Sequence, residues 1–229
     1  DTPTHIKEAA KKALDKGFVH YTPNLGILDL RQSLSESLKK YKNLTYDPLT
    51  EIMVTAGGQE AMYLSLMALL EPGDEVLIPD PGYSQFTTCV RLAGGVAVPY
   101  PLLLEENSAP DLEAAEMLLS DRTRAIIVNS PHNPTGGVMT PQQVEGVCGF
   151  AKNYDLLLFS DDAYDRMVFE GSRFVSPASF PGMKDKTVLW GSLSKTYSMT
   201  GWRIGYLAAP ADLVAGAVKM QQNVLLSVC

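Results

Sequence analysis

Short apolar runs alternate with amphipathic stretches along most of the chain after residue 47. The apolar runs predict strands at Ile52–Thr55, Val76–Pro79, Val96–Tyr100, Ala125–Asn129, Leu156–Ser160, Thr187–Trp190 and Ile204–Ala208. Apolar residues at helical spacing between these runs predict helices at Gln59–Leu70, Ser84–Leu92, Leu112–Leu119 and Pro141–Tyr154. Two further helices are predicted ahead of this region, at Thr4–Lys16 and Leu28–Tyr41.

Near-continuous apolar strands separated by helices predict an α/β fold. In such a fold a mostly parallel central sheet is covered by helices on both faces, which makes a three-layer sandwich. The chain begins at Asp1 without a methionine and ends within the apolar run Val224–Val228. Because a natural terminus seldom leaves an apolar helix face exposed, we expect a fragment of a larger protein.

Charge and cysteine content narrow the class of partner. The formal net charge is -7 at pH 7, and an acidic chain of this kind argues against nucleic acid as the main partner. We expect no membrane span, because no apolar run reaches the necessary length. The three cysteines are scattered, without a Cys-x-x-Cys pair, which favours a reducing cytoplasm. The histidines lack metal-ligand spacing, so no metal site is predicted.

Distinctive residues follow four of the predicted strands. Gly57-Gly58 follows the first strand, and Asn133, Asp161 and Lys195 follow later ones. Ligands of open α/β sheets bind outside the carboxyl ends of the strands, where these loops converge. The pattern therefore predicts one crevice to which all four loops contribute.

The stretch from Gly191 to Arg203 places Lys195 and an arginine among six hydroxyl side chains. Hydroxyls such as those of Ser192 and Ser194, together with the guanidinium fork of Arg203, suit a phosphate group. The amine of a lysine can form a Schiff base with a carbonyl. Phosphate and aldehyde on one ligand suggest pyridoxal phosphate, whereas the alternative is a solvated loop with a surface lysine.

Two turns admit either a ligand contact or a purely structural role. Gly57-Gly58-Gln59 leads from a strand into a helix, where exposed N–H groups bind phosphate, or it is simply a tight connecting turn. Tyr83 can cover one face of a flat ring, or it can belong to the hydrophobic core.

Asn133 and Asp161 also allow two interpretations each. Prolines before and after Asn133 stiffen its loop and orient its amide, which favours a ligand contact over a well-made turn. Asp161 follows apolar residues, so its carboxylate needs a cationic partner such as a pyridinium nitrogen, with Tyr164 near the same ring, or else it caps a helix.

Taken together, these segments resemble the class I/II aminotransferases, a family of fold type I pyridoxal-phosphate enzymes. The matching motifs occur in the family's order and cover about Tyr21 to Tyr206. They are Tyr21-Thr22-Pro23-Asn24-Leu25-Gly26 with Leu30-Arg31, Gly57-Gly58-Gln59-Glu60-Ala61, Pro72-Gly73-Asp74-Glu75-Val76, Asn133-Pro134-Thr135-Gly136, Asp161-x-x-Tyr164, Ser192-x-Ser194-Lys195 and Gly201-Trp202-Arg203-Ile204-Gly205.

The resemblance implies a role for each matching residue. It makes Lys195 the Schiff-base lysine and proton carrier, Asp161 the partner of the pyridine nitrogen, and Tyr164 a ligand of the ring's phenolic oxygen. The remaining implied contacts are Asn133 at that oxygen, Tyr83 stacked on the ring, and Gly58, Gln59, Ser192, Ser194 and Arg203 at the phosphate. Tyr21 would reach the phosphate of a neighbouring subunit, which implies a homodimer.

The same resemblance implies a division of the chain and a reaction. Residues 1–45 would be a helical segment contributing to a small domain and to the dimer contact, and residues 46–229 the cofactor-binding large domain, with the C-terminal small domain absent. The implied reaction exchanges an amino group between an L-amino acid and a 2-oxo acid, although this fragment alone would be inactive. A β-lyase, a cyclopropane-carboxylate synthase and a cofactor-binding sensor domain of a transcription regulator remain alternatives.

The chain departs from many relatives at Asp162-Ala163, where they carry Glu-Ile or Glu-Val. We expect this departure to leave the pairing of Asp161 with Tyr164 unaffected.

Overall fold

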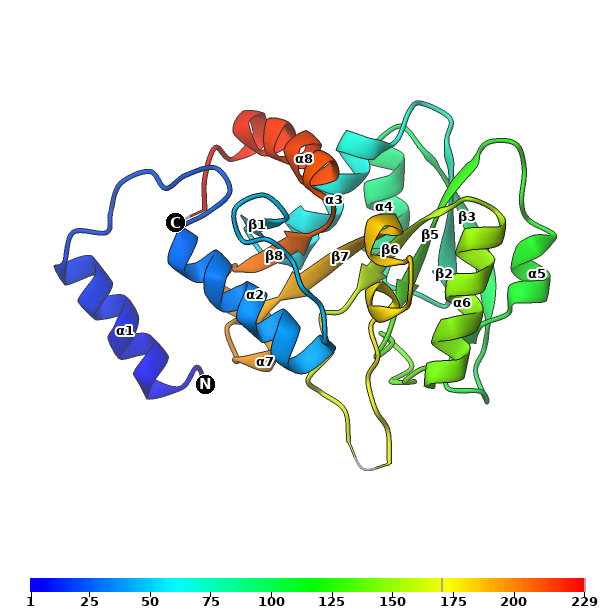
Figure 1. The fold of residues 1–229 in the computed structure, drawn as a ribbon, viewed down its shortest axis with the longest axis horizontal. Coiled ribbons are helices and arrows are strands. Elements are labelled where there is room, and N and C mark those ends of the chain that lie inside the picture. The colour runs from blue at the N-terminus through cyan, green and yellow to red at the C-terminus, as the bar shows by residue number, and fades with distance from the viewer. Residues whose placement is uncertain (170, 229) are drawn as a thin grey trace.

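A central sheet organises the part of the chain that the structure describes, residues 1–169 and 171–228 of a computed structural model (Figure 1). Its eight strands lie in the order β1-β8-β7-β6-β5-β2-β3-β4. The strands are β1 (Ile52–Thr55), β2 (Glu75–Asp80), β3 (Val96–Leu103), β4 (Ala109–Pro110), β5 (Thr123–Asn129), β6 (Leu157–Asp161), β7 (Thr187–Ser192) and β8 (Gly205–Ala208).

Most neighbouring strands of this sheet are parallel. Strands β3, β2, β5, β6 and β7 run side by side in one direction, whereas β8 is antiparallel to both β7 and β1, and β4 to β3. Buried parallel strands are apolar on both faces, which explains the short continuous runs in the sequence. The predicted α/β class with a mostly parallel sheet is confirmed.

Helices cover both faces of the sheet and complete three layers (Figure 1). One face carries α3, α4 and α8, and the other carries α2, α5 and α6. The helices are α1 (Thr4–Asp15), α2 (Leu28–Lys42), α3 (Gly58–Leu69), α4 (Gln85–Leu92), α5 (Leu112–Glu116), α6 (Pro141–Asn153), α7 (Leu193–Thr196) and α8 (Ala211–Val224), and the 3-10 turns are η1 (Pro177–Ser179), η2 (Lys184–Lys186) and η3 (Thr200–Trp202).

Alternate residues of each strand enter opposite cores. In β6, Phe159 packs with α3 and α4 on one face, whereas Leu158 packs under α6 on the other. This period of two fixes which side chains at the strand end face each layer. Helix α1 differs from the rest: none of its residues is buried, and it lies beside the layered body in Figure 1.

Some elements differ from the sequence predictions. The helix predicted at 112–119 ends at Glu116, because Leu118 and Leu119 donate to the carbonyls three residues back and so tighten the chain into turns. Helices α7 and α8 and the two-residue strand β4 were not predicted. Among the described helices, none combines the length and the apolar character needed to cross a membrane.

Candidate functional site

A cavity of about 310 Å³ opens where the loops after β1, β2, β5, β6 and β7 meet, and we call it the loop cavity. Ten of the eleven predicted cofactor-site residues line it: Gly58, Gln59, Tyr83, Asn133, Asp161, Tyr164, Ser192, Ser194, Lys195 and Arg203. The eleventh, Tyr21, does not line it. The predicted convergence of loops at one crevice is therefore present in the fold.

The region around Arg203 gathers donors suited to an anion. Arg203 adopts a left-handed backbone conformation with φ 53°, and its guanidinium donates to the carbonyls of Thr200 and Ala56. Gly57, at φ 84°, leaves no room for a side chain there, since a Cβ would overlap Arg203. Helix α3 begins at Gly58, so its free N–H groups and the positive end of its dipole add to the guanidinium.

Ser192 and Ser194 stand beside this region. Ser192 caps the short helix α7, because its Oγ accepts a hydrogen bond of 3.2 Å from the backbone N–H of Ser194. A Cβ added to Gly58 would lie 3.4 Å from the Gly191 carbonyl oxygen and 3.6 Å from the Cβ of Ser192. These are ordinary van der Waals distances, so the start of α3 packs directly against the end of β7.

Asp161 ends β6 with its carboxyl directed to the cavity side. Its Oδ1 accepts from the N–H of Ala163 at 3.1 Å, in a turn rather than at the start of a helix, so the helix-cap alternative does not apply. Burial raises the pKa of the Asp161 carboxyl from 3.8 to about 6, although the Ala163 hydrogen bond opposes this. A carboxylate in this environment gains from a cationic partner.

Asn129, at the end of β5, joins the loops that carry Asp161 and Asn133. Its side-chain amide donates to the carbonyl of Asp161 at 3.0 Å, and its Oδ1 accepts from the N–H of Asn133 at 2.8 Å. Asn129 and Asp161 are direct partners in the parallel β5–β6 pairing. One buried side chain thus fixes the spacing of two predicted cofactor residues.

Lys195 lies in α7 with its amine 5.7 Å from the centre of the Tyr164 ring. Its side chain is exposed toward the cavity, and among the described residues the structure records no carboxylate in ion-pair contact with it. An amine held near a phenol, without a competing ion pair, is available to a carbonyl carbon or to a transferable proton.

Aromatic packing supports the wall formed by Tyr83. Its ring meets Phe86 edge to face, with centroids 5.7 Å apart, and the Phe86 ring lies 6.4 Å from that of Trp190. Trp190 in turn stacks on Phe159 and donates to the hydroxyl of Ser65. A ring supported from behind in this way presents a rigid face to the cavity.

Tyr21 lies outside the loop cavity, and 85% of its surface is exposed. Sequence reasoning also missed contributors to the cavity wall, namely Met62, Ala163, Trp190 and Thr200. Trp190 ends an apolar strand run and looked like core, whereas Met62 lies one helical turn after Gly58. The position of Asn129 at a strand end was a signal that its side chain could form hydrogen bonds to two neighbouring loops.

Comparison with known proteins shows what the chain is similar to. The sequence profile described as "Aminotransferase class I and II" matches residues 1–229. The aromatic-amino-acid aminotransferase 2 of Thermococcus litoralis is 42% identical over 221 residues, which is 96% of this chain and 57% of that protein. The aspartate aminotransferase of Pyrococcus abyssi is 41% identical with the same coverage. The chain thus spans a little over half the length of these relatives.

Solved structures agree with the sequence comparison. The aromatic aminotransferase of Pyrococcus horikoshii OT3 superposes with a TM-score of 0.97 at 42% identity, covering 100% of this chain and 61% of that one. The aspartate aminotransferase of Thermus thermophilus with maleate gives a TM-score of 0.94 at 37% identity, covering 100% of this chain and 59% of that one.

Proposed function

The chain belongs to the class I and II aminotransferase family, and on this premise we propose that the full-length protein transfers an amino group between an L-amino acid and a 2-oxo acid. Members of this family use pyridoxal phosphate. One observation carries the proposal: ten predicted cofactor residues from separate segments, nine of which belong to family motifs, line a single cavity.

The residues present fit this cofactor. The donors around Arg203, Gly58 and Ser192 suit a phosphate. Asp161 offers a carboxylate to a protonated ring nitrogen, with a Coulomb energy of about 4 kcal/mol at 4 Å and an effective dielectric of 20. Asn133 and Tyr164 offer polar groups to a phenolic oxygen, and Tyr83 offers a ring face. The two halves of the cavity therefore match the two ends of the ligand.

When bound, pyridoxal phosphate supplies an aldehyde carbon and a ring that accepts the electron pair left on the substrate's α-carbon. The Nζ of Lys195 would hold the aldehyde end until the amine of the substrate displaces it, and the freed lysine amine would then move the α-proton. Asp161 keeps the ring nitrogen protonated by its negative charge. Tyr164, beside the lysine amine, orients the phenolic side of the ring.

Substitution of Lys195 tests the proposal. In the full-length wild-type protein loaded with cofactor, addition of an L-amino acid without an oxo acid is expected to release one equivalent of 2-oxo acid per site. Lys195→Ala is expected to abolish this release and the covalent attachment of cofactor, measured by borohydride reduction and peptide mass. Lys219→Ala is the matched control, because Lys219 is exposed on α8 outside the loop cavity.

The outcomes separate the alternatives. Release of ammonia with the oxo acid would favour a β-lyase. A product that keeps the α-amine and closes a three-membered ring, with loss of the leaving group from the γ-carbon, would favour the synthase. Stable cofactor binding without conversion across a broad panel of amino acids would favour a sensor domain. Attachment of the cofactor to another lysine in the wild type would contradict the assignment of Lys195.

We also propose a homodimer in which Tyr21 reaches the phosphate of the neighbouring subunit. The exposure of Phe18, Val19 and Tyr21 in the segment between α1 and α2 supports a contact surface there. Residues 1–45 would belong to this contact and to the small domain, and residues 46–229 to the large domain. The cytoplasm is the proposed location, because Cys89 and Cys148 are buried as free thiols.

A further inference from the structure

We propose that Lys42 is a positioning residue for the loop cavity, because it holds the turn that carries Asp161 and Tyr164 from the side opposite the cavity. The inference rests on the proposed function only in that it takes the loop cavity as a pyridoxal-phosphate site. Lys42 is the last residue of α2, far from the cavity residues in sequence, and it does not line the loop cavity.

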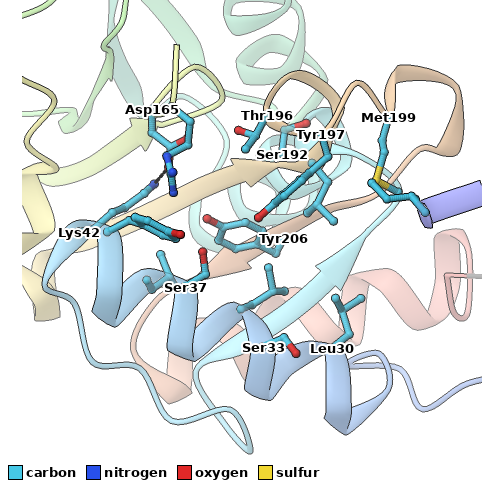
Figure 2. Close-up of a pocket in the computed structure, with 16 residues that line it drawn as sticks. Leu30, Ser33, Ser37, Lys42, Asp165, Ser192, Thr196, Tyr197, Met199 and Tyr206 are labelled. Atoms are coloured by element: carbon cyan, nitrogen blue, oxygen red, sulfur yellow. Dashed lines mark ion pairs between the residues drawn. The ribbon is translucent and has the colours of Figure 1, made fainter. Parts of the chain in front are cut away.

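Lys42 forms a buried ionic cluster with Asp162 and Asp165, which we call the Lys42 cluster. Its Nζ lies 2.8 Å from Oδ2 of Asp162 and 2.8 Å from Oδ2 of Asp165. The side chains of Lys42 and Asp162 are only 3% and 1% exposed. Figure 2 shows Lys42 extending from α2 to Asp165, at the end of a cavity of about 240 Å³ between the helix and the strand that carries Tyr206.

The Lys42 cluster and the loop cavity share one five-residue turn. Asp161 and Tyr164, its first and fourth residues, line the loop cavity, whereas Asp162 and Asp165, its second and fifth, contact Lys42. The turn closes on itself, since the N–H of Asp165 donates to the Asp162 carbonyl at 3.1 Å. Any shift of the Lys42 contacts is therefore passed to the two cavity residues through the backbone between them.

Asp162 is fixed on every side that the structure describes. Its N–H donates to the Trp190 carbonyl at 3.0 Å, and its Oδ1 accepts from the Ser160 hydroxyl at 2.6 Å. Its second carboxylate oxygen accepts from Lys42. Asp162 is the first residue after β6, and neighbouring residues of an extended segment point to opposite sides. Anchoring Asp162 on the Lys42 side therefore favours the position of Asp161 in the wall of the loop cavity.

The cluster also sets the charge next to Asp161. Burial alone would lower the pKa of Lys42, but Asp162 and Asp165 raise it above its usual value, so Lys42 stays cationic. At Asp161, the negative charge of Asp162 raises the carboxyl pKa, while the positive charge of Lys42 lowers it. The other titratable groups that share the cavity with Asp161 are Tyr83, Tyr164, Lys195 and Arg203.

The variant Lys42→Met tests the inference in two measurements, because methionine keeps an apolar side chain of similar length and removes the charge. In cofactor-free full-length protein, the dissociation constant for pyridoxal phosphate is expected to rise about tenfold, by analogy with the loss found when residues that position metal ligands are removed. The titration midpoint of the Asp161 carboxyl, followed by carbon NMR, is expected to move upward from about 6. Lys42→Arg is expected to restore the midpoint at least in part.

Two variants control for loss of stability alone. Lys184→Met breaks another ion pair between distant segments, with Glu51 at 2.8 Å, and neither residue lines the loop cavity. Val144→Ala creates a void in the core under α6. Both are expected to lower the melting temperature while leaving the dissociation constant and the Asp161 midpoint unchanged.

The inference is overturned if Lys42→Met behaves like these controls, with reduced melting temperature but wild-type affinity and midpoint. If Lys42→Met does not fold, Asp165→Asn decides the question, since it removes one of the two carboxylates that hold Lys42. Its dissociation constant is then expected to rise about threefold, a loss of the size of one hydrogen bond, and an unchanged value overturns the inference. Absence of transamination would contradict the proposed function, whereas the comparison of Asp161 titration midpoints between wild type and Lys42→Met would still test the inference.

Discussion

The loop cavity and the Lys42 cluster lie on opposite sides of the turn that follows β6, and they differ in whether their charged groups are paired within the protein. In the Lys42 cluster, one buried ammonium forms ion pairs with two carboxylates, and the Ser160 hydroxyl donates a hydrogen bond to Asp162. In the loop cavity, Lys195 and Arg203 face the cavity without a carboxylate in ion-pair contact among the described residues. The two regions contain similar residue types but differ in how many of their polar groups the protein itself satisfies.

This difference separates structural charges from ligand-binding charges. A buried charge whose partners are already present contributes to the fold and is costly to disrupt. A charge that the protein leaves open toward a cavity is available to a ligand that brings the complementary group. Asp161 and Asp162, adjacent in sequence, are the sharpest case, because each belongs to a different region.

The largest expected effect comes from exchanging each aspartate for asparagine. Asp161→Asn is expected to lower the transamination kcat about a thousandfold, since it removes a Coulomb interaction of about 4 kcal/mol with the ring nitrogen. Asp162→Asn is expected to lower the free energy of unfolding by about 3 kcal/mol, because it breaks a buried pair. Kinetics and urea denaturation on both variants check this contrast.

The pH dependence of stability provides a second readout of the Asp161 variant. The folded-state pKa of Asp161 is about 6, above the ordinary 3.8. The stability that this carboxyl contributes is therefore present below pH 3.8 and is lost as the pH rises through about 6. Asp161→Asn should make the cofactor-free protein more stable at pH 7. Equal losses of turnover in the two asparagine variants, without destabilisation by Asp162→Asn, would refute the separation of the two regions.

A smaller effect is expected at the phosphate end of the loop cavity. Gly57→Ala and Gly73→Ala place a side chain at similar positive φ values of 84° and 91°, so both incur backbone strain. Only at Gly57 would the new Cβ overlap Arg203, whereas nothing lies within 4 Å of a Cβ at Gly73. Cofactor affinity, measured by titration of the cofactor-free protein, is expected to fall about tenfold for Gly57→Ala alone, as for loss of one charge-assisted hydrogen bond. Equal cofactor affinities in the two variants would contradict the assignment of Arg203 to the phosphate site.

The smallest effect is expected from Tyr21→Phe. Loss of one hydroxyl contact is expected to weaken cofactor affinity about fivefold, the equivalent of one hydrogen bond. The melting temperature should stay unchanged, because Tyr21 is 85% exposed. Dilution of the wild-type protein below its dimer dissociation constant should reproduce the same loss of affinity. A monomeric wild-type protein with full affinity would contradict the shared site.

The sequence predicted the sheet well because strands whose residues are all buried leave a local signature, a short continuous apolar run. The run Ile52–Thr55 became β1 with identical bounds, and strand-end loops carried the cavity residues. Strand direction has no such signature, so the reversal of β8 could not be read from its apolar run. Helix α8 was missed, although Asp212 in its first turn is a helix-start signal.

Long-range ion pairs were beyond sequence reasoning for a similar reason. Lys42 and Asp162 lie 120 residues apart, and a lysine at the end of a polar helix looks like any solvated charge. The pattern did show Asp162 as a departure from many relatives, but we expected it to be neutral toward Asp161 and Tyr164. Only the three-dimensional arrangement reveals that Asp162 anchors the turn between them.

The pairing of β7 with β8 has a consequence for how the loop cavity assembles during folding. Ser192 pairs with Gly205, and Leu193 donates to the Ile204 carbonyl at 3.1 Å, so the excursion that contains both Lys195 and Arg203 closes at its base. Closing a short loop costs little chain entropy. The two cations can therefore come together through local contacts, whereas the contact of Arg203 with Ala56 spans 147 residues and must wait for the sheet. The anion-binding end of the cavity is thus expected to be the last part of it to form.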